Sequence, residues 1–142
     1  MHGFLLQDWT TIRMQFGLSN VIQTEANWLD LQGYQDAIMW LEVREASFAT
    51  GTSPPTQLKF DYETSPTRDE SMFRVGVSSA AFTGPFAAGS TPDVQKILVS
   101  STVPLARWLR WKLAIAAGGV GTVGASDVTF RIAVAANMIG GR

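Results

Sequence analysis

Apolar and polar side chains alternate along five stretches of this sequence, and the alternation limits the fold more than any other feature. In residues 58–63, Leu58, Phe60 and Tyr62 alternate with charged residues, so one face of an extended chain is apolar and the other polar. The same pattern occurs at 39–44, 73–77, 109–115 and 128–134. A period of two residues is typical of β-strands with one buried face. The five stretches therefore predict an all-β chain.

Clusters of turn-forming residues separate these stretches. They lie at 50–55, 65–69, 83–92 and 118–126, and most are rich in Gly, Pro, Ser or Thr. Strands spaced by such turns are typical of antiparallel sandwiches and barrels. We predict a single antiparallel β-sandwich of about eight strands with little helix. The residues expected to face its core are Met39, Leu41, Val43, Leu58, Phe60, Tyr62, Leu109, Trp111, Leu113, Phe130, Ile132 and Val134.

The N-terminal segment fits two patterns. Its apolar residues at helical spacing are Leu5, Trp9, Ile12 and Phe16. From Ile12 to Phe16, however, apolar and polar residues also alternate, and the threonines at 10 and 11 favour a strand. We predict that residues 1–19 form an extended N-terminal arm or edge strand, and that residues 20–142 form the sandwich domain. Residues 20–31 are expected to form a further strand that ends at Gly33.

The composition limits the chemistry open to a chain of 142 residues. It has no cysteine and one histidine, His2, so the usual nucleophiles, bases and zinc ligands are missing. The net charge of −1 argues against general nucleic-acid binding, which needs a basic surplus. No apolar stretch approaches the roughly 20 residues of a membrane span, and no signal peptide is recognisable. We predict a protein that is not an enzyme, with no catalytic residues, no cofactor and no membrane association.

Three motifs could bind a ligand, and each has a simpler interpretation. Residues 119–124 match G-x-G-x-x-G, but a predicted strand follows where a dinucleotide site needs a helix, which favours a hairpin loop. Asp61 and Glu63 share one strand face, which is more typical of a solvated face than of a catalytic pair. Asp69 and Glu70, which follow a turn, are the first candidates for a calcium site. We nevertheless predict no metal site.

The most distinctive local feature is a ribbon of arginine and tryptophan at 107–112. Trp108, Arg110 and Lys112 are predicted to share one strand face. Arginine and aromatic residues are enriched at protein interfaces and lysine is depleted there; of the 11 basic residues, only three are lysines. Because only 16% of the residues are charged, part of the surface must be apolar or neutral. Our interface candidates are Leu5, Trp9, Phe16, Arg107, Trp108 and Arg110.

Four segments carry a resemblance to a known group of proteins. They are NWLDLQGYQDAIMWLEVRE at 27–45, LKFDYETSPTRDESMF at 58–73, VPLARWLRWKLAI at 103–115 and SDVTFRIAVAAN at 126–137. The chain resembles small structural proteins of tailed bacteriophages over roughly residues 20–139. These motifs are strands and turns, not chemical signatures.

The resemblance implies a jelly-roll β-sandwich located in the virion, assembled in the host cytoplasm. It implies a capsid decoration or cement protein that associates with itself, for example as a trimer, and binds a major capsid protein. The ARWLRW strand is also similar to the closing strands of galactose-binding-like jelly rolls, which gives a carbohydrate-binding module as the alternative. The loop aromatics available for a sugar are Phe48, Phe82 and Phe86.

Overall fold

The computed structural model of the chain describes residues 1–14, 20–47, 57–83, 93–97, 102–117 and 126–140. Ten strands and two short 3-10 turns lie within these residues. In chain order they are β1 (His2–Met14), β2 (Asn20–Ile22), η1 (Glu25–Asn27), β3 (Leu29–Asp30), β4 (Tyr34–Ser47), β5 (Gln57–Ser65), η2 (Glu70–Met72), β6 (Arg74–Ser78), β7 (Phe82–Thr83), β8 (Asp93–Ile97), β9 (Trp108–Ala117) and β10 (Ser126–Met138).

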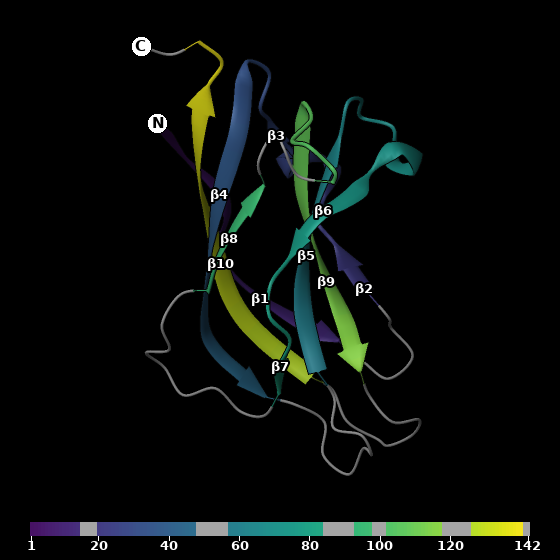
Figure 1. Cartoon of the computed structure of the whole chain (residues 1–142). Helices are drawn as coiled ribbons and strands as arrows, with labels where there is room; N and C mark the ends of the chain where they lie inside the picture. The colour runs from purple at the N-terminus through teal and green to yellow at the C-terminus, as the bar shows by residue number, and fades with distance from the viewer. Residues whose placement is uncertain (15–19, 48–56, 84–92, 98–101, 118–125, 141–142) are drawn as a thin grey trace.

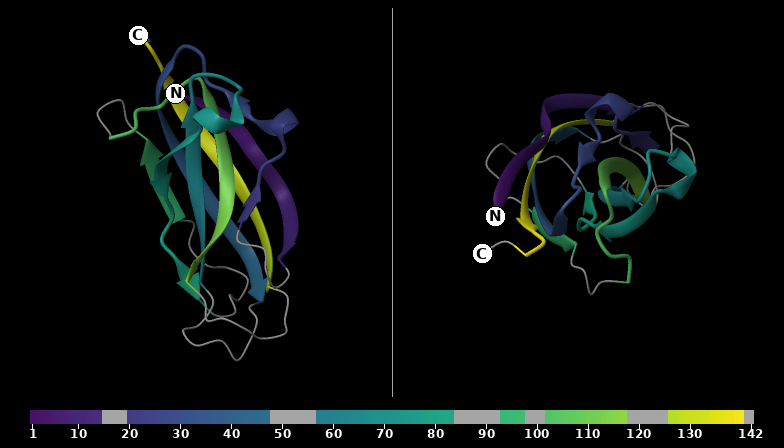
Figure 2. Two further views of the ribbon diagram at one scale, coloured as in Figure 1. Left: turned by 90° about the vertical axis from the view of Figure 1, so that its right-hand side faces the viewer. Right: turned by 90° about the horizontal axis from the view of Figure 1, so that it is seen from above.

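The strands form two sheets that pack face to face (Figure 1). Sheet A has the order β1-β10-β4-β8, and sheet B has the order β2-β9-β5-β6, with β3 also paired to β9 and β7 to β5. The view from above in Figure 2 shows β1 and β10 together in one layer and β9 in the other. Every pair of described strands is antiparallel.

The connectivity is that of a jelly roll. The first long strand pairs with the last, β2 and β3 pair with β9, β4 pairs with β8, and β5 pairs with β6. This nesting of early strands with late ones, divided between two sheets, is the double Greek-key arrangement of jelly rolls. The predicted all-β antiparallel sandwich of jelly-roll type is therefore confirmed.

The alternation predicted the core correctly. Eleven of the twelve residues expected inside are at most 3% exposed, and Val43 is partly buried against them. At the centre, the ring of Phe130 lies 4.5 Å from that of Phe60 and 5.1 Å from that of Trp111, centroid to centroid. These contacts join the two sheets, since Phe130 belongs to sheet A and the other two rings to sheet B.

Four of the five alternating stretches have the faces that the sequence predicts, and the stretch at 73–77 differs. Val77 lies opposite Tyr62 and packs on the core, whereas Val75 lies opposite Glu63 and is 39% exposed. The strand pairing shifts register between Tyr62 and Glu63. An extra residue in one strand reverses the faces beyond it, so strict alternation could not hold here.

The N-terminal segment is an edge strand of the sandwich. β1 pairs with β10 along its length, and Leu6 is 3% exposed within the core. The predicted strand at 20–31 is interrupted: β2 and β3 both pair with β9, and η1 lies between them. Buried Gln23 follows β2; its Nε2 donates to the Leu6 carbonyl at 2.7 Å, and its Oε1 accepts from the Trp111 N–H at 3.2 Å. It thereby links the two sheets.

Several predicted features lie outside the described residues. They are Phe16, Phe48, Phe86, the turn at 50–55 and the G-x-G-x-x-G segment at 119–124. The turn expected at 65–69 is present, and the segment after 126 is the predicted strand β10. No helix in the described residues is long and apolar enough to cross a membrane.

Candidate interaction surfaces

The outer face of sheet B carries a network of opposite charges. Trp108, Arg110 and Lys112 share this face, as predicted, because Leu109, Trp111 and Leu113 point into the core. Glu63 on β5 accepts from Arg110 Nε at 2.8 Å and from Lys112 Nζ at 2.7 Å. Asp61 lies 3.2 Å from Lys59 Nζ and accepts from the Ser78 hydroxyl at 2.6 Å.

Arg110 is buried inside this network. Its guanidinium carbon lies 4.0 Å from the ring centre of Phe73 and 5.1 Å from that of Trp28, and the side chain is 4% exposed. The two rings follow η2 and η1, which therefore cover this part of sheet B. Nη1 has no hydrogen-bond partner, although it lies 3.5 Å from the exposed Glu70 carboxylate. The sequence places Arg110 among the interface candidates, but in this conformation it offers no surface to a partner.

The carboxylates that the sequence analysis considered as ligands interact with other groups of the chain. Asp61 and Glu63 neutralise lysine and arginine, as described above. Asp69 accepts from the Ser71 hydroxyl at 2.8 Å and from the Ser71 N–H at 2.9 Å, which caps η2, and these two hydrogen bonds hold the pKa of Asp69 below its ordinary value. No group of three or more metal-ligating residues occurs within the described part of the chain.

Arg107 and Trp108 form an exposed cluster at the start of β9. The guanidinium carbons of Arg107 and Arg68 lie 5.2 Å and 4.9 Å from the centre of the Trp108 ring. Arg107 also binds Asp30 through two nitrogens, the closer pair at 2.8 Å. A partly exposed tryptophan in contact with two arginines has the composition of an interface hot spot. We call Arg68, Arg107 and Trp108 the Arg/Trp cluster.

The ion pair of Asp30 gives a pH-dependent prediction. Hydrogen bonding to Arg107 is the main cause that holds the pKa of Asp30 below its ordinary value of 3.8. A carboxyl whose pKa is lowered on folding stabilises the fold above its unfolded pKa, and this contribution falls as the pH drops through the lowered value. We expect the melting-temperature difference between wild type and Asp30→Asn to stay constant from about pH 7 to about pH 5 and to narrow below about pH 4. A difference that does not narrow below about pH 4 would show that the ionised Asp30 carboxylate does not stabilise the fold.

The outer face of sheet A differs from that of sheet B. Leu5 lies opposite Ala133, which lies opposite Trp40, and in the next row Gly3, Ala135 and Ile38 are aligned in the same way. All six face outward, since the residues alternating with them in β10 and β4 are buried. We call this set the sheet A patch. Its members are Gly3, Leu5, Ile38, Trp40, Ala133 and Ala135.

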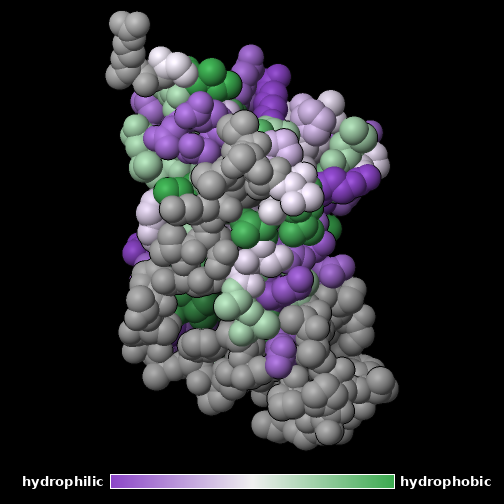
Figure 3. Space-filling view, viewed as in Figure 1, coloured by the Kyte–Doolittle hydropathy of each residue, from purple (hydrophilic) through white to green (hydrophobic). Residues whose placement is uncertain are grey.

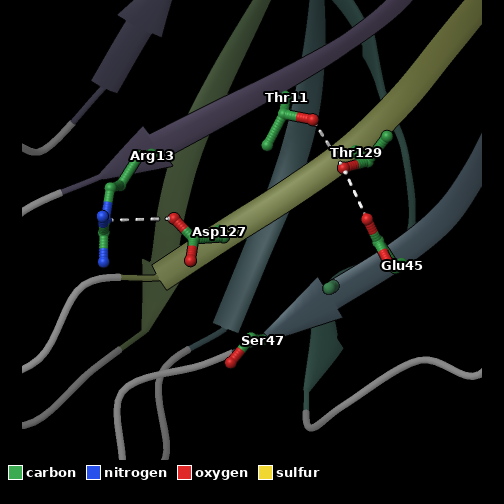
Figure 4. A pocket seen from close by; sticks show the side chains of 7 residues that line it. Thr11, Arg13, Glu45, Ser47, Asp127 and Thr129 are labelled. Atoms are coloured by element: carbon green, nitrogen blue, oxygen red, sulfur yellow. Dashed lines mark hydrogen bonds and ion pairs between the residues drawn. The ribbon is translucent and has the colours of Figure 1, made fainter.

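Polar residues border the patch along the same strands. Trp9, 38% exposed, lies with its ring centre 4.9 Å from the guanidinium carbon of Arg131, and Arg131 Nη2 is 2.6 Å from Glu42. Further along, a shallow hollow is lined mainly by polar residues (Figure 4). There the Thr11 and Thr129 hydroxyls are 2.8 Å apart, and Arg13 lies 3.4 Å from Asp127.

The structure divides the interface candidates between two sheets. Leu5 and Trp9 lie on the outer face of sheet A, whereas Arg107, Trp108 and Arg110 belong to sheet B. The sequence analysis missed Ile38, Trp40, Ala133 and Ala135 as surface residues. In the side view of Figure 3, the described residues show hydrophobic groups mixed with hydrophilic ones. In the apolar rows on sheet A, Gly3 and Leu5 are exposed and the other four residues are partly buried.

Neither a protein-family model nor a curated protein matches this chain. Among solved structures, it is similar to the crystal structure of the infectious bursal disease virus VP2 subviral particle, with a TM-score of 0.49 and 11% sequence identity. The alignment covers 94% of this chain and 32% of that chain, so this chain spans about a third of its length. The assignment of the jelly roll rests on the strand pairing described above and not on this likeness.

Proposed function

We propose that this chain is a non-enzymatic structural protein of a virus particle, a decoration or cement protein that associates with itself and binds the major capsid lattice. The observation that carries the proposal is the presence of two separate candidate surfaces on opposite sheets. A decoration protein needs one contact with its own copies and another with the lattice. The sheet A patch and the Arg/Trp cluster can supply these two contacts without overlap.

The proposed mechanism is passive. Jelly rolls occur in viral capsid proteins and in lectins, so the fold permits this role but does not select it. Each surface would contribute by removing apolar and aromatic area from water, at roughly 25 cal/mol per Å² before the cost of association. The chain would stiffen a shell by bridging lattice subunits, with its rigid sandwich as the spacer.

The surroundings of Trp108 do not favour the alternative of a carbohydrate-binding module. Sugar binding by stacking needs an accessible aromatic face, and two guanidinium groups lie within 5.2 Å of the centre of the Trp108 ring. A glycan array with the purified chain, using Trp108→Ala as the control, distinguishes the two functions. Specific glycan binding that Trp108→Ala abolishes would favour the carbohydrate function over the one proposed.

The lattice contact can be tested by co-sedimentation with capsids of the virus whose genome encodes this chain. We expect Trp108→Ala and Arg107→Ala each to weaken binding about tenfold or more, as hot-spot residues do. Arg13→Ala is the matched control, because it removes another exposed arginine paired with an aspartate, but on sheet A. We expect this control to bind like the wild type.

Two results would contradict the proposal. Failure of the wild-type chain to sediment with capsids, together with its absence from purified particles, would remove the virion role. Unchanged binding of both cluster variants would show that another surface meets the lattice. Removing the whole N-terminal segment is a poor test, because residues 1–16 contain an edge strand and the buried Leu6.

A further inference from the structure

The two outer faces of this sandwich have different surroundings. Sheet B carries Lys59, Asp61, Glu63, Arg110 and Lys112 outward, and segments of the chain itself cover part of it. The described chain places no such cover over the centre of the sheet A patch: Leu5 is 56% exposed, and a Cβ atom added at Gly3 would meet nothing within 4 Å. Among the residues that the structure describes, sheet A is thus the face left open for another layer.

The shape of the patch suits packing against another sheet. Its centre is built from the small residues Ala133 and Ala135 on β10, and larger residues stand on either side: Leu5 on β1, and Ile38 and Trp40 on β4. A low centre between raised flanks allows side chains of an opposing sheet to settle over the alanines, as the inner faces of a sandwich do.

The charges around the patch favour a partner without strong charge. Arg131 is paired with Glu42, and Arg13 with Asp127. The Glu45 carboxylate accepts from the Thr129 hydroxyl at 3.3 Å. Because Arg131 and Arg13 are already paired with carboxylates of the chain, a highly charged partner gains little from them. Two copies of this face can meet without strong like-charge repulsion.

The area of the face also suits a second copy. β1, β10 and β4 contain 13, 13 and 14 residues. At about 3.3 Å per residue and about 4.8 Å between strands, their outer faces cover about 600 Å². Two copies packed face to face would bury about 1,200 Å², the lower limit for a specific interface.

We infer that the sheet A patch is the self-association surface of this chain, where a second copy docks sheet to sheet. The inference rests on the self-association in the proposed function and specifies its location. It assigns Ala133 to the centre of the contact, with Leu5 and Trp40 as its anchors and the Arg131–Glu42 pair, in the next row of outward residues, inside it. The Arg/Trp cluster on the opposite sheet stays free for the lattice.

A charge placed at the centre of the patch tests this assignment. By sedimentation velocity from 1 to 100 μM (about the range in which weak homodimers form), we expect the wild type to dimerise. Ala133→Glu should raise the dissociation constant at least about tenfold, since it buries an unpaired carboxylate. Ala26→Glu is the matched control, because it makes the same change at an exposed alanine in η1. We expect it to dimerise normally.

A second measurement does not depend on disrupting the surface. The chain contains no cysteine, so a single cysteine can be cross-linked without competing thiols. Ala133→Cys with a bismaleimide of about 10 Å, the spacing of packed sheets, should give a covalent dimer. Ala26→Cys should not. The substitution is small enough to leave the fold intact even if Ala133→Glu fails to fold.

The outcomes separate this inference from the proposed function. A wild-type dimer that persists in Ala133→Glu and does not cross-link through Ala133→Cys would overturn the patch and leave self-association standing. A wild type that stays monomeric at about 100 μM would overturn the inference, because a specific dimer forms at concentrations of about that order. Capsid co-sedimentation of that monomer would still support the lattice contact.

Discussion

Phe130→Ala is expected to lower the free energy of unfolding by about 3–5 kcal/mol, the range for deleting a large aromatic from a packed core. Phe130 is 0% exposed and contacts Phe60 and Trp111 of the opposite sheet. The loss combines the transfer of the ring from water with the cavity left between the two sheets. Because three aromatic rings meet here, neighbouring side chains can fill little of that cavity without leaving their rotamers.

Urea unfolding of the two proteins at one pH measures this loss. Val75→Ala is the control, because Val75 is also in a strand but is 39% exposed, and its truncation should change stability by no more than about 0.5 kcal/mol. A loss below about 1 kcal/mol for Phe130→Ala would place the ring outside the core. It would also contradict the register of β10 against β4.

The core could be predicted because the long central strands bury one face each. Alternate residues are apolar from Leu58 to Tyr62 in β5 and from Leu109 to Leu113 in β9, and the period of two identifies the inward set without knowledge of the partners. The same reasoning fails at Val75, because the register shift in the β5–β6 pair cannot be seen in a single strand. The jelly-roll pairing of the first strand with the last is also a long-range feature that no local pattern contains.

The sequence does contain a pattern that indicates the sheet A patch, but a search for alternating apolar and polar residues does not detect it. In β4 the stretch 37–41 is apolar at every position, and in β10 the stretch 132–136 is too. Strands that are apolar on both sides are typical of sheets covered on both faces. The sequence therefore contained evidence of a second covered face, but the alignment of Leu5, Ala133 and Trp40 in one row depends on the pairing of β1, β10 and β4.

The burial of Arg110 could not be predicted from its own strand. Its position alternates with core residues and so predicts an outward side chain, which is what the structure has. The side chains that cover Arg110 are those of Trp28 and Phe73. These two residues lie far from Arg110 in the sequence, and they directly follow η1 and η2. A side chain that points outward from sheet B is therefore not always exposed to solvent.

Glu63→Ala is expected to cost about 3–5 kcal/mol of unfolding free energy, as removal of one partner of a buried ion pair does. The Glu63 side chain is 7% exposed and that of Arg110 is 4% exposed, with Glu63 Oε2 2.8 Å from Arg110 Nε. Without Glu63, the Arg110 guanidinium stays packed against the rings of Trp28 and Phe73, and the carboxylate that the described residues leave near it is that of exposed Glu70, at 3.5 Å. Lys112 also loses its closest carboxylate.

The chain supplies a matched control for this loss. Glu42 forms an equivalent pair with Arg131 between adjacent strands of sheet A, but the two side chains are 37% and 44% exposed. Glu42→Ala should therefore cost only about 0.2–1 kcal/mol, and added salt should reduce that cost further. Urea unfolding at low and high salt separates the two sites, because the buried pair is poorly screened. Equal losses for the two variants would show that water reaches Arg110 and that η1 and η2 do not seal this face of sheet B.

If the cost of Glu63→Ala comes from an unpaired buried charge, removing that charge as well should recover stability. The double variant Glu63→Leu with Arg110→Met replaces the pair with apolar side chains of similar volume, a change that is often neutral or stabilising. We expect it to be more stable than Glu63→Ala by about 2 kcal/mol or more, with Lys112 still close to Asp61 at 3.7 Å. Recovery would mean that the ion pair holds the turns over sheet B in one arrangement and contributes little net stability. No recovery would mean that Glu63 is needed for Lys112 as much as for Arg110.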